Sequence, residues 1–172
     1  MKRSSTQKGF TLLELVIYLT LVVGILVTAT TFAWNIINSR TKAFAIQEVQ
    51  QNGRFIMDKF TQTVRSAQDI TVPVTGASGD TLELVMRDVS KDPIIFSLSG
   101  GILSMSAGGG TTYDLHSSAI TVSALQFTNV SSVDDASRNV QVQVTLEHKN
   151  PENRSEREFS ETFRTTIELR DR

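Results

Sequence analysis

An apolar run of 25 residues, from Phe10 to Trp34, constrains this chain more than any other feature of its sequence. As an α-helix, at about 1.5 Å per residue, the run is long enough to cross a hydrocarbon core of roughly 30 Å. Glu14 is its only charged residue. A carboxylate at the middle of a membrane helix costs roughly 2.5 to 3.5 kcal/mol, and less near an end. The run therefore predicts a membrane-spanning helix whose carboxylate another group must compensate.

Residues 1–9 form a polar leader ahead of the run, and three of them are basic. This is the layout of an export or insertion signal. An ordinary secretory signal peptide fits poorly, because the nearest small-residue cleavage pattern, at 43–45, lies well beyond the apolar run. A plain signal anchor is the second alternative. The distribution of basic residues supports a cytoplasmic N-terminus only weakly, since Arg40 and Lys42 follow the run.

Composition limits the remaining possibilities. With 172 residues, 40% hydrophobic and 20% charged, the chain has material for one modest domain besides the apolar run. Its formal net charge is -1, and loss of the leader would make it -4, so nothing in the charge balance indicates a nucleic-acid partner. The absence of cysteine excludes disulfides, thiolate metal sites and a cysteine nucleophile.

A helical pattern continues beyond the apolar run. Apolar and small residues recur at steps of three or four between 43 and 68, with polar residues at the other positions. The stripe consists of Ile46, Val49, Gly53, Ile56, Phe60, Val64 and Ala67. We therefore expect one long helix with a transmembrane half at 10–34 and an amphipathic half at 35–68. Gly53 within the stripe predicts close packing rather than a hinge.

Beyond residue 68 the apolar pattern changes to a period of two, which is typical of strands. Strand-like segments lie at 81–87, 93–98, 102–105, 113–115, 120–130, 140–146 and 159–169. A change of phase near Ser123 and Ala124 predicts a bulge or a break in the fifth segment. We expect an α+β fold in which residues 69–172 form an antiparallel sheet of hairpins that buries the helix stripe on one face.

The segment from Lys8 to Leu15, Lys-Gly-Phe-Thr-Leu-Leu-Glu-Leu, resembles the processing site of type IV prepilins and of the pseudopilins of type II secretion. The resemblance implies that a prepilin peptidase cleaves after Gly9, that Phe10 becomes the N-methylated first residue, and that Glu14 is required for assembly. It also implies a pilin-like fold. Weaker similarities further along, at 58–67, 125–127 and 165–170, are to minor subunits, PilW-like or pseudopilin J-like.

Physical chemistry gives these three residues consistent roles. Gly9 offers a peptidase a flexible, unobstructed backbone where the leader meets the helix. Cleavage would expose an amine on Phe10. If that amine lay near Glu14 of a neighbouring subunit, two charges at about 4 Å would attract by about 4 kcal/mol at an effective dielectric near 20, before desolvation is subtracted. The alternative for Glu14 is a carboxylate that snorkels to the membrane surface.

The resemblance implies a non-enzymatic filament subunit. Such a subunit is held in the cytoplasmic membrane by a single span with its C-terminal domain outside the cytoplasm, and then enters a filament in the periplasm or at the cell surface. Its partners would be the prepilin peptidase and methyltransferase, other pilin or pseudopilin subunits and, indirectly, an assembly platform and ATPase. The competing hypothesis is a membrane-anchored binding or adhesion module that does not polymerise.

Catalytic and metal-binding patterns are weak. His116 and His148 lie in or beside predicted strands without metal-ligand spacing, and no catalytic motif is present. Asp134 and Asp135 could contribute to a calcium loop, although the ligand spacing of a known loop is missing, so a solvated loop is favoured. We therefore expect no catalytic residue, no cofactor and no strong metal site.

Overall fold

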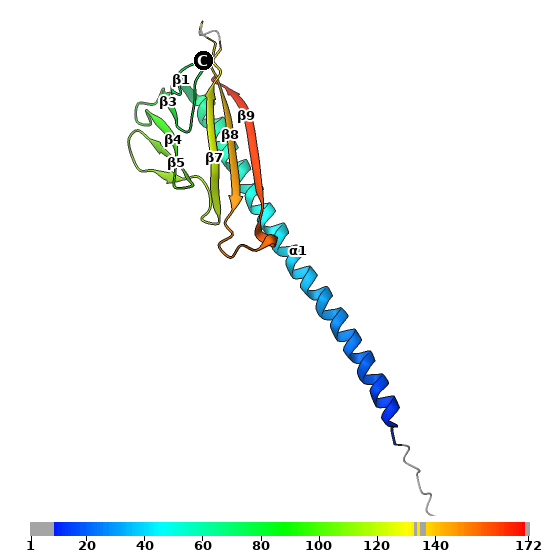
Figure 1. Cartoon of the computed structure of the whole chain (residues 1–172). Coiled ribbons are helices and arrows are strands. Elements are labelled where there is room, and N and C mark those ends of the chain that lie inside the picture. Colours follow the sequence, from blue (N-terminus) through cyan, green and yellow to red (C-terminus); the bar gives the residue numbers. More distant parts are fainter. Residues whose placement is uncertain (1–8, 133, 135–136, 171–172) are drawn as a thin grey trace, which may run out of the picture. The chain divides into compact units, whose positions relative to one another are not determined.

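The computed structural model describes residues 9–132, 134 and 137–170. It contains one long helix followed by antiparallel strands, which confirms the predicted α+β class (Figure 1). Its elements are α1 Leu12–Ser66, β1 Ala67–Val72, β2 Ser78–Gly79, β3 Leu82–Met86, β4 Ile94–Ser99, β5 Ile102–Ala107, β6 Tyr113–Asp114, β7 Ile120–Asn129, β8 Asn139–His148, the 3-10 helix Ser155–Arg157 and β9 Ser160–Glu168. The chain divides into two compact units at residue 40, and α1 contributes to both.

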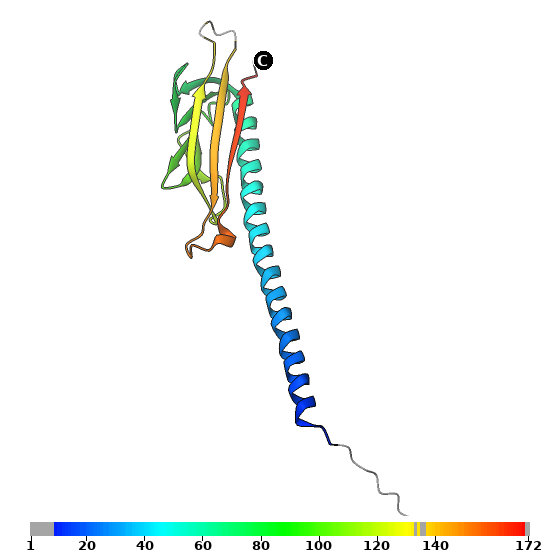
Figure 2. The same ribbon diagram turned by 45° about the vertical axis from the view of Figure 1, so that its right-hand side comes forward.

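The strands form two sheets instead of the one expected. The first has the order β1-β3-β4-β5-β6, and the second has the order β2-β7-β8-β9 (Figure 2). A helix of about 10–12 Å diameter spans only two or three strands spaced about 4.8 Å apart. One helix therefore could not cover a nine-stranded sheet. With two sheets, each can turn its apolar face towards the helix.

The part of α1 after residue 40 packs against both sheets along the predicted stripe. Val49, Ile56, Phe60 and Val64 are fully buried there, and Gly53 is buried with them. These residues follow helical spacing, so they lie on one face of α1. The opposite positions are exposed and mostly polar, which matches the amphipathic pattern of the sequence.

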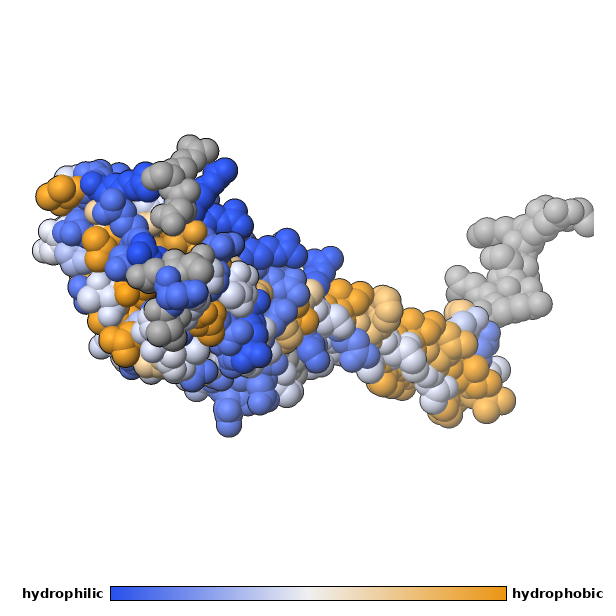
Figure 3. Space-filling view, turned by 90° about the horizontal axis from the view of Figure 1, so that it is seen from above, coloured by the Kyte–Doolittle hydropathy of each residue, from blue (hydrophilic) through white to orange (hydrophobic). Residues whose placement is uncertain are grey.

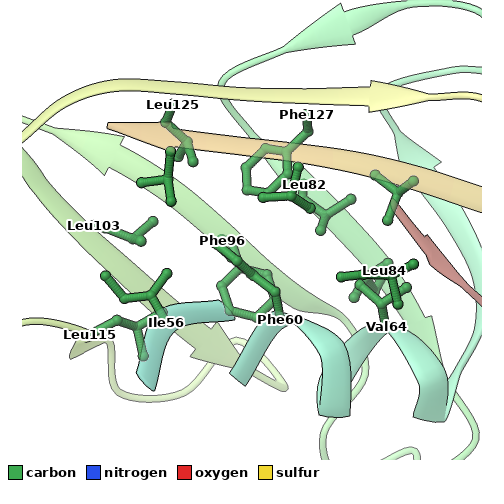
Figure 4. Close-up of a cluster of buried hydrophobic side chains, with 14 of the residues drawn as sticks. Ile56, Phe60, Val64, Leu82, Leu84, Phe96, Leu103, Leu115, Leu125 and Phe127 are labelled. Atoms are coloured by element: carbon green, nitrogen blue, oxygen red, sulfur yellow. The ribbon is translucent and has the colours of Figure 1, made fainter. Parts of the chain in front are cut away.

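Phe60 lies at the centre of the core. Its ring meets Phe96 of β4 edge-on, with ring centroids 4.9 Å apart, and Phe127 of β7 at 5.3 Å (Figure 4). The two partners come from different sheets. Edge-to-face aromatic pairs contribute about 0.5–1.5 kcal/mol each beyond the area they bury. Phe60 therefore joins the helix to both sheets at one point.

The strands follow the predicted segments with two additions between the helix end and residue 81, β1 and the two-residue strand β2. The register of β7 against β8 shifts between Val122 and Ala124, which confirms the predicted bulge. The helix, however, ends at Ser66. Ala67 is already the first residue of β1, where it pairs with Met86 of β3. β1 was not predicted. Its β-branched residues before Pro73 favour an extended chain, and this preference ends the helix just before the last residue of the apolar stripe.

We predict that Gly53→Ala destabilises the domain. The ring of Phe163 in β9 occupies the space that a Cβ atom at Gly53 would need. Overpacking of this kind costs about 1–3 kcal/mol, against a gain of about 1 kcal/mol in helix propensity. Urea unfolding followed by circular dichroism in detergent measures the difference.

Two further variants make this test specific. Gly24→Ala is the matched control, because no atom lies within 4 Å of the corresponding Cβ position. Adding Phe163→Leu to Gly53→Ala should restore part of the lost stability. A higher unfolding midpoint for Gly53→Ala alone would contradict the close approach of helix and strand.

Candidate functional site

The N-terminal segment places the predicted cleavage site at the boundary between irregular chain and helix. Gly9 is exposed, and no atom lies within 4 Å of the position that a Cβ atom would take. Phe10 is 78% exposed, and its ring meets Tyr18 edge-on at a centroid distance of 6.3 Å. The Gly9–Phe10 bond therefore lies outside helical hydrogen bonding and is open to an approaching enzyme.

Thr11 caps the helix. Its side-chain oxygen accepts a hydrogen bond from the backbone N–H of Glu14 at 3.3 Å, and its carbonyl accepts the first helical bond from Leu15 at 3.2 Å. A hydroxyl residue with glutamate three positions later is the sequence pattern of a capping box. The hydroxyl satisfies one of the backbone donors that every helix leaves unpaired at its N-terminus.

Glu14 lies in the first turn of α1 and is partly exposed. The positive end of the helix dipole stabilises a carboxylate there by about 0.3–1 kcal/mol. Among the described residues, its carboxylate makes no hydrogen bond or ion pair. The structure thus explains how the charge is tolerated at this end of the helix, and it leaves both carboxylate oxygens available to a group from outside the chain.

The threonine side chains that follow Thr11 in the apolar run are satisfied within the helix. Thr20, Thr28, Thr30 and Thr31 each donate their hydroxyl to a backbone carbonyl three or four residues earlier, at 2.8–3.1 Å. Such bonds remove the cost of placing a hydroxyl in hydrocarbon. Glu14 therefore differs from these threonines, because its polar group has no such partner.

The large apolar side chains of α1 between Leu12 and Ile37 are exposed, and Figure 3 shows them as a mostly orange stretch on the face in view. Its most apolar stretch of 18 residues has no buried residue, and α1 is the only described helix long and apolar enough to cross a membrane. Length and composition are the grounds for this statement, and signal sequences share both. The helix is compatible with a membrane anchor.

A second polar cluster joins α1 to the sheets. Glu48 accepts a hydrogen bond from the hydroxyl of Ser117 at 3.0 Å, and Asn52 accepts one from the backbone N–H of Ser117 at 2.9 Å. The Nε2 atom of His148 lies 3.9 Å from the other oxygen of Glu48. The carboxylate lies between hydroxyl and imidazole, so His148 is not placed to take a proton from Ser117, as nucleophilic catalysis requires. The arrangement is a tether between helix and sheet.

His116 also has a structural partner. Its Nε2 atom accepts the backbone N–H of Leu103 at 3.1 Å, and its Nδ1 atom lies 3.0 Å from the carbonyl of Ser117. Within the described part of the chain, no three His, Asp or Glu residues are grouped so as to hold a metal ion. Asp134 is exposed, whereas Asp135 lies outside the described residues, so the calcium hypothesis stays without a described site.

Comparisons with known proteins do not identify the chain. No protein family matches it, and neither does any curated protein or solved structure. The resemblance to prepilins therefore rests on the residues that carry it, and function has to be argued from the chemistry and geometry of the N-terminal segment.

Sequence reasoning singled out Gly9, Phe10 and Glu14. The structure places Gly9 and Phe10 in the irregular segment just before α1, and Glu14 in the first turn of α1. It missed the role of Thr11 as the helix cap. The spacing of Thr11 and Glu14 carries the signal that could have found it. The tether between Glu48 and Ser117 could not have been found this way, because 69 residues separate the two.

We predict that Thr11→Ala loosens the first turn of α1. Loss of a capping hydroxyl costs about 1 kcal/mol, so the backbone amides of Leu13, Glu14 and Leu15 should exchange with solvent about fivefold faster. Hydrogen exchange of the full chain in detergent micelles measures this change. Thr11→Ser keeps the hydroxyl and should leave exchange unchanged. If these amides exchanged at the same rate in Thr11→Ala as in the wild-type chain, the cap would contribute nothing to the stability of the first turn.

Proposed function

We propose that the chain is a non-enzymatic subunit of a type IV pilus-like or type II secretion-like filament, and a minor subunit rather than the major one. In this proposal a prepilin peptidase cleaves after Gly9 and Phe10 is then N-methylated. Until assembly, the apolar half of α1 holds the subunit in the cytoplasmic membrane, with the domain after residue 40 outside the cytoplasm.

The observation that carries the proposal is the carboxylate of Glu14, which has no partner among the described residues and lies four residues after an exposed Gly9–Phe10 bond. The threonines of the same run satisfy their hydroxyls internally, so a carboxylate without a partner requires a separate explanation. A new amine on Phe10 of a neighbouring subunit would supply the opposite charge. The pair would form only on assembly, and its desolvation cost would be offset only there.

The prepilin resemblance gives this chemistry a biological setting. Basic leader, glycine, phenylalanine, hydroxyl residue, two leucines and glutamate occur in the order of a prepilin processing site. The exposed junction suits a peptidase that works at the membrane face, because the scissile bond is outside the helix. The assignment to a minor subunit is supported by the weaker similarities between residues 58 and 170.

The mature N-terminus tests the first half of the proposal. In cells that hold an active prepilin peptidase, mass spectrometry should find a chain that begins at Phe10 and carries one added methyl group. Gly9→Val should block cleavage, because the bulky side chain obstructs the scissile bond. An intact leader on the wild-type chain would overturn the filament assignment and favour the permanent membrane anchor of a binding or adhesion module.

Variants of Glu14 test the second half. Glu14→Val should insert and be cleaved normally, yet its incorporation into filaments should fall by at least about tenfold, because one partner of a buried charge pair is lost. Glu14→Asp should retain part of the incorporation, since it keeps the charge. Leu13→Val is the matched control and should behave as wild type. Normal incorporation of Glu14→Val would show that the carboxylate is incidental.

A further inference from the structure

The outer edge of β9 differs from the other three sheet edges of this chain. The edges β2 and β6 have two residues each, and β1 is irregular, with two shifts in its register against β3. Short strands and bulges are common means of protecting an edge from pairing with another chain. β9 has neither. It runs beside β8 (Figure 2), and the two strands pair over nine residues without a register shift. It also contains no proline, glycine or lysine.

The alternation of hydrogen-bonded residues along an antiparallel strand shows which backbone groups of β9 are free. His148 donates to the carbonyl of Phe159, and Leu169 donates to that of Arg138, so odd-numbered residues on this strand exchange bonds with β8. The even-numbered residues then point their backbone N–H and C=O groups outward. Their side chains are all exposed, and no described strand lies on that side. These residues are Ser160, Thr162, Arg164, Thr166 and Glu168.

The odd-numbered side chains of β9 lie on the face that turns towards α1. Ile167 is buried, and the ring of Phe163 rests on Gly53. Glu161 is on the same face, and its Oε2 atom is buried without a hydrogen-bond partner in the described part of the chain. A buried carboxylate oxygen without a donor is costly. A strand added along the edge would bring its own side chains to about 4.5–5.5 Å from these three.

We infer that the edge of β9 binds an extended strand of another protein chain, with a lysine or arginine opposite Glu161 and apolar residues opposite Phe163 and Ile167. The free backbone groups would bind the strand, and the Glu161 carboxylate would select it by charge. A second copy of β9 does not fit this description. It carries no basic residue on the face of Glu161, so the Oε2 atom would stay unpaired. The inference does not depend on whether the chain polymerises.

A designed peptide tests the inference with the full chain in detergent micelles. The peptide Thr-Val-Thr-Val-Thr-Val-Thr-Lys-Thr, paired antiparallel, places its lysine opposite Glu161 and its valines opposite Phe163, Thr165 and Ile167. At saturation with the peptide, the backbone amides of the five even-numbered residues of β9 should exchange with solvent at least about tenfold more slowly than without it. The odd-numbered amides already bond to β8 and should change little. Unchanged exchange at the even-numbered positions would overturn the inference.

Charge exchange tests the selection by Glu161. Replacing the peptide lysine with glutamate should weaken binding about tenfold, as loss of a hydrogen bond to a charged group does. Glu161→Gln should reduce the preference for the lysine peptide, and Glu161→Lys should reverse it. Protection of the odd-numbered amides shows that each variant is folded. Equal binding of both peptides to the wild-type chain would show that Glu161 selects nothing.

A final pair of variants tests the backbone itself. Thr166→Pro removes an outward N–H that β8 does not use, so it should abolish peptide binding and leave the odd-numbered amides protected. Thr166→Ala is its matched control and should bind the peptide as wild type does. A peptide that binds the proline variant normally must lie elsewhere, and this result would also overturn the inference.

Discussion

The contact of Phe60 with two other rings holds the domain together. Phe96 approaches from one sheet and Phe127 from the other, so the helix is fixed to both sheets through one residue. Gly53, two turns earlier, lets the ring of Phe163 approach the helix axis. The direction in which the amphipathic half of α1 crosses the sheets therefore depends on one large and one minimal side chain of the same stripe.

Polar groups in the two halves of α1 are satisfied by different means. In the apolar half, threonine hydroxyls bond to the helix backbone itself, which suits a segment with no water or protein around it. In the amphipathic half, Glu48 and Asn52 bond to Ser117 in a loop between strands. Glu14 follows neither pattern. The helix dipole stabilises its charge, but the carboxylate oxygens have no partner among the described residues.

Our two proposals concern two features of the chain that differ in chemistry. Glu14 presents a single charge at the start of an apolar helix, where binding of an amine would be strongly favoured by the low dielectric. The edge of β9 presents a row of free backbone N–H and C=O groups. A strand bound there would be held by many hydrogen bonds, each weaker than the charge pair of Glu14. The charge pair of Glu14 would fix the register between neighbouring helices. The edge of β9 would bind an extended segment that carries one basic residue and apolar residues at alternate positions.

The sequence by itself determined the class of elements and their order. An uninterrupted apolar run predicts a membrane-length helix, spacing of three and four residues predicts the buried stripe from Val49 to Val64, and alternation predicts the long strands β7 and β8. A change of phase at Ser123 even located a bulge, because side-chain periodicity is a local property. The candidate residues Gly9, Phe10 and Glu14 also came from local sequence.

Only the tertiary structure decided which elements meet. The division into two sheets, the strand β1 and the regular outer edge of β9 depend on which strands pair over long distances, and local periodicity does not record pairing. The same holds for the buried oxygen of Glu161 that has no partner among the described residues. Local sequence sets the conformation of each segment. Which hydrogen-bonding groups stay unpaired depends on the packing and strand pairing of the whole fold.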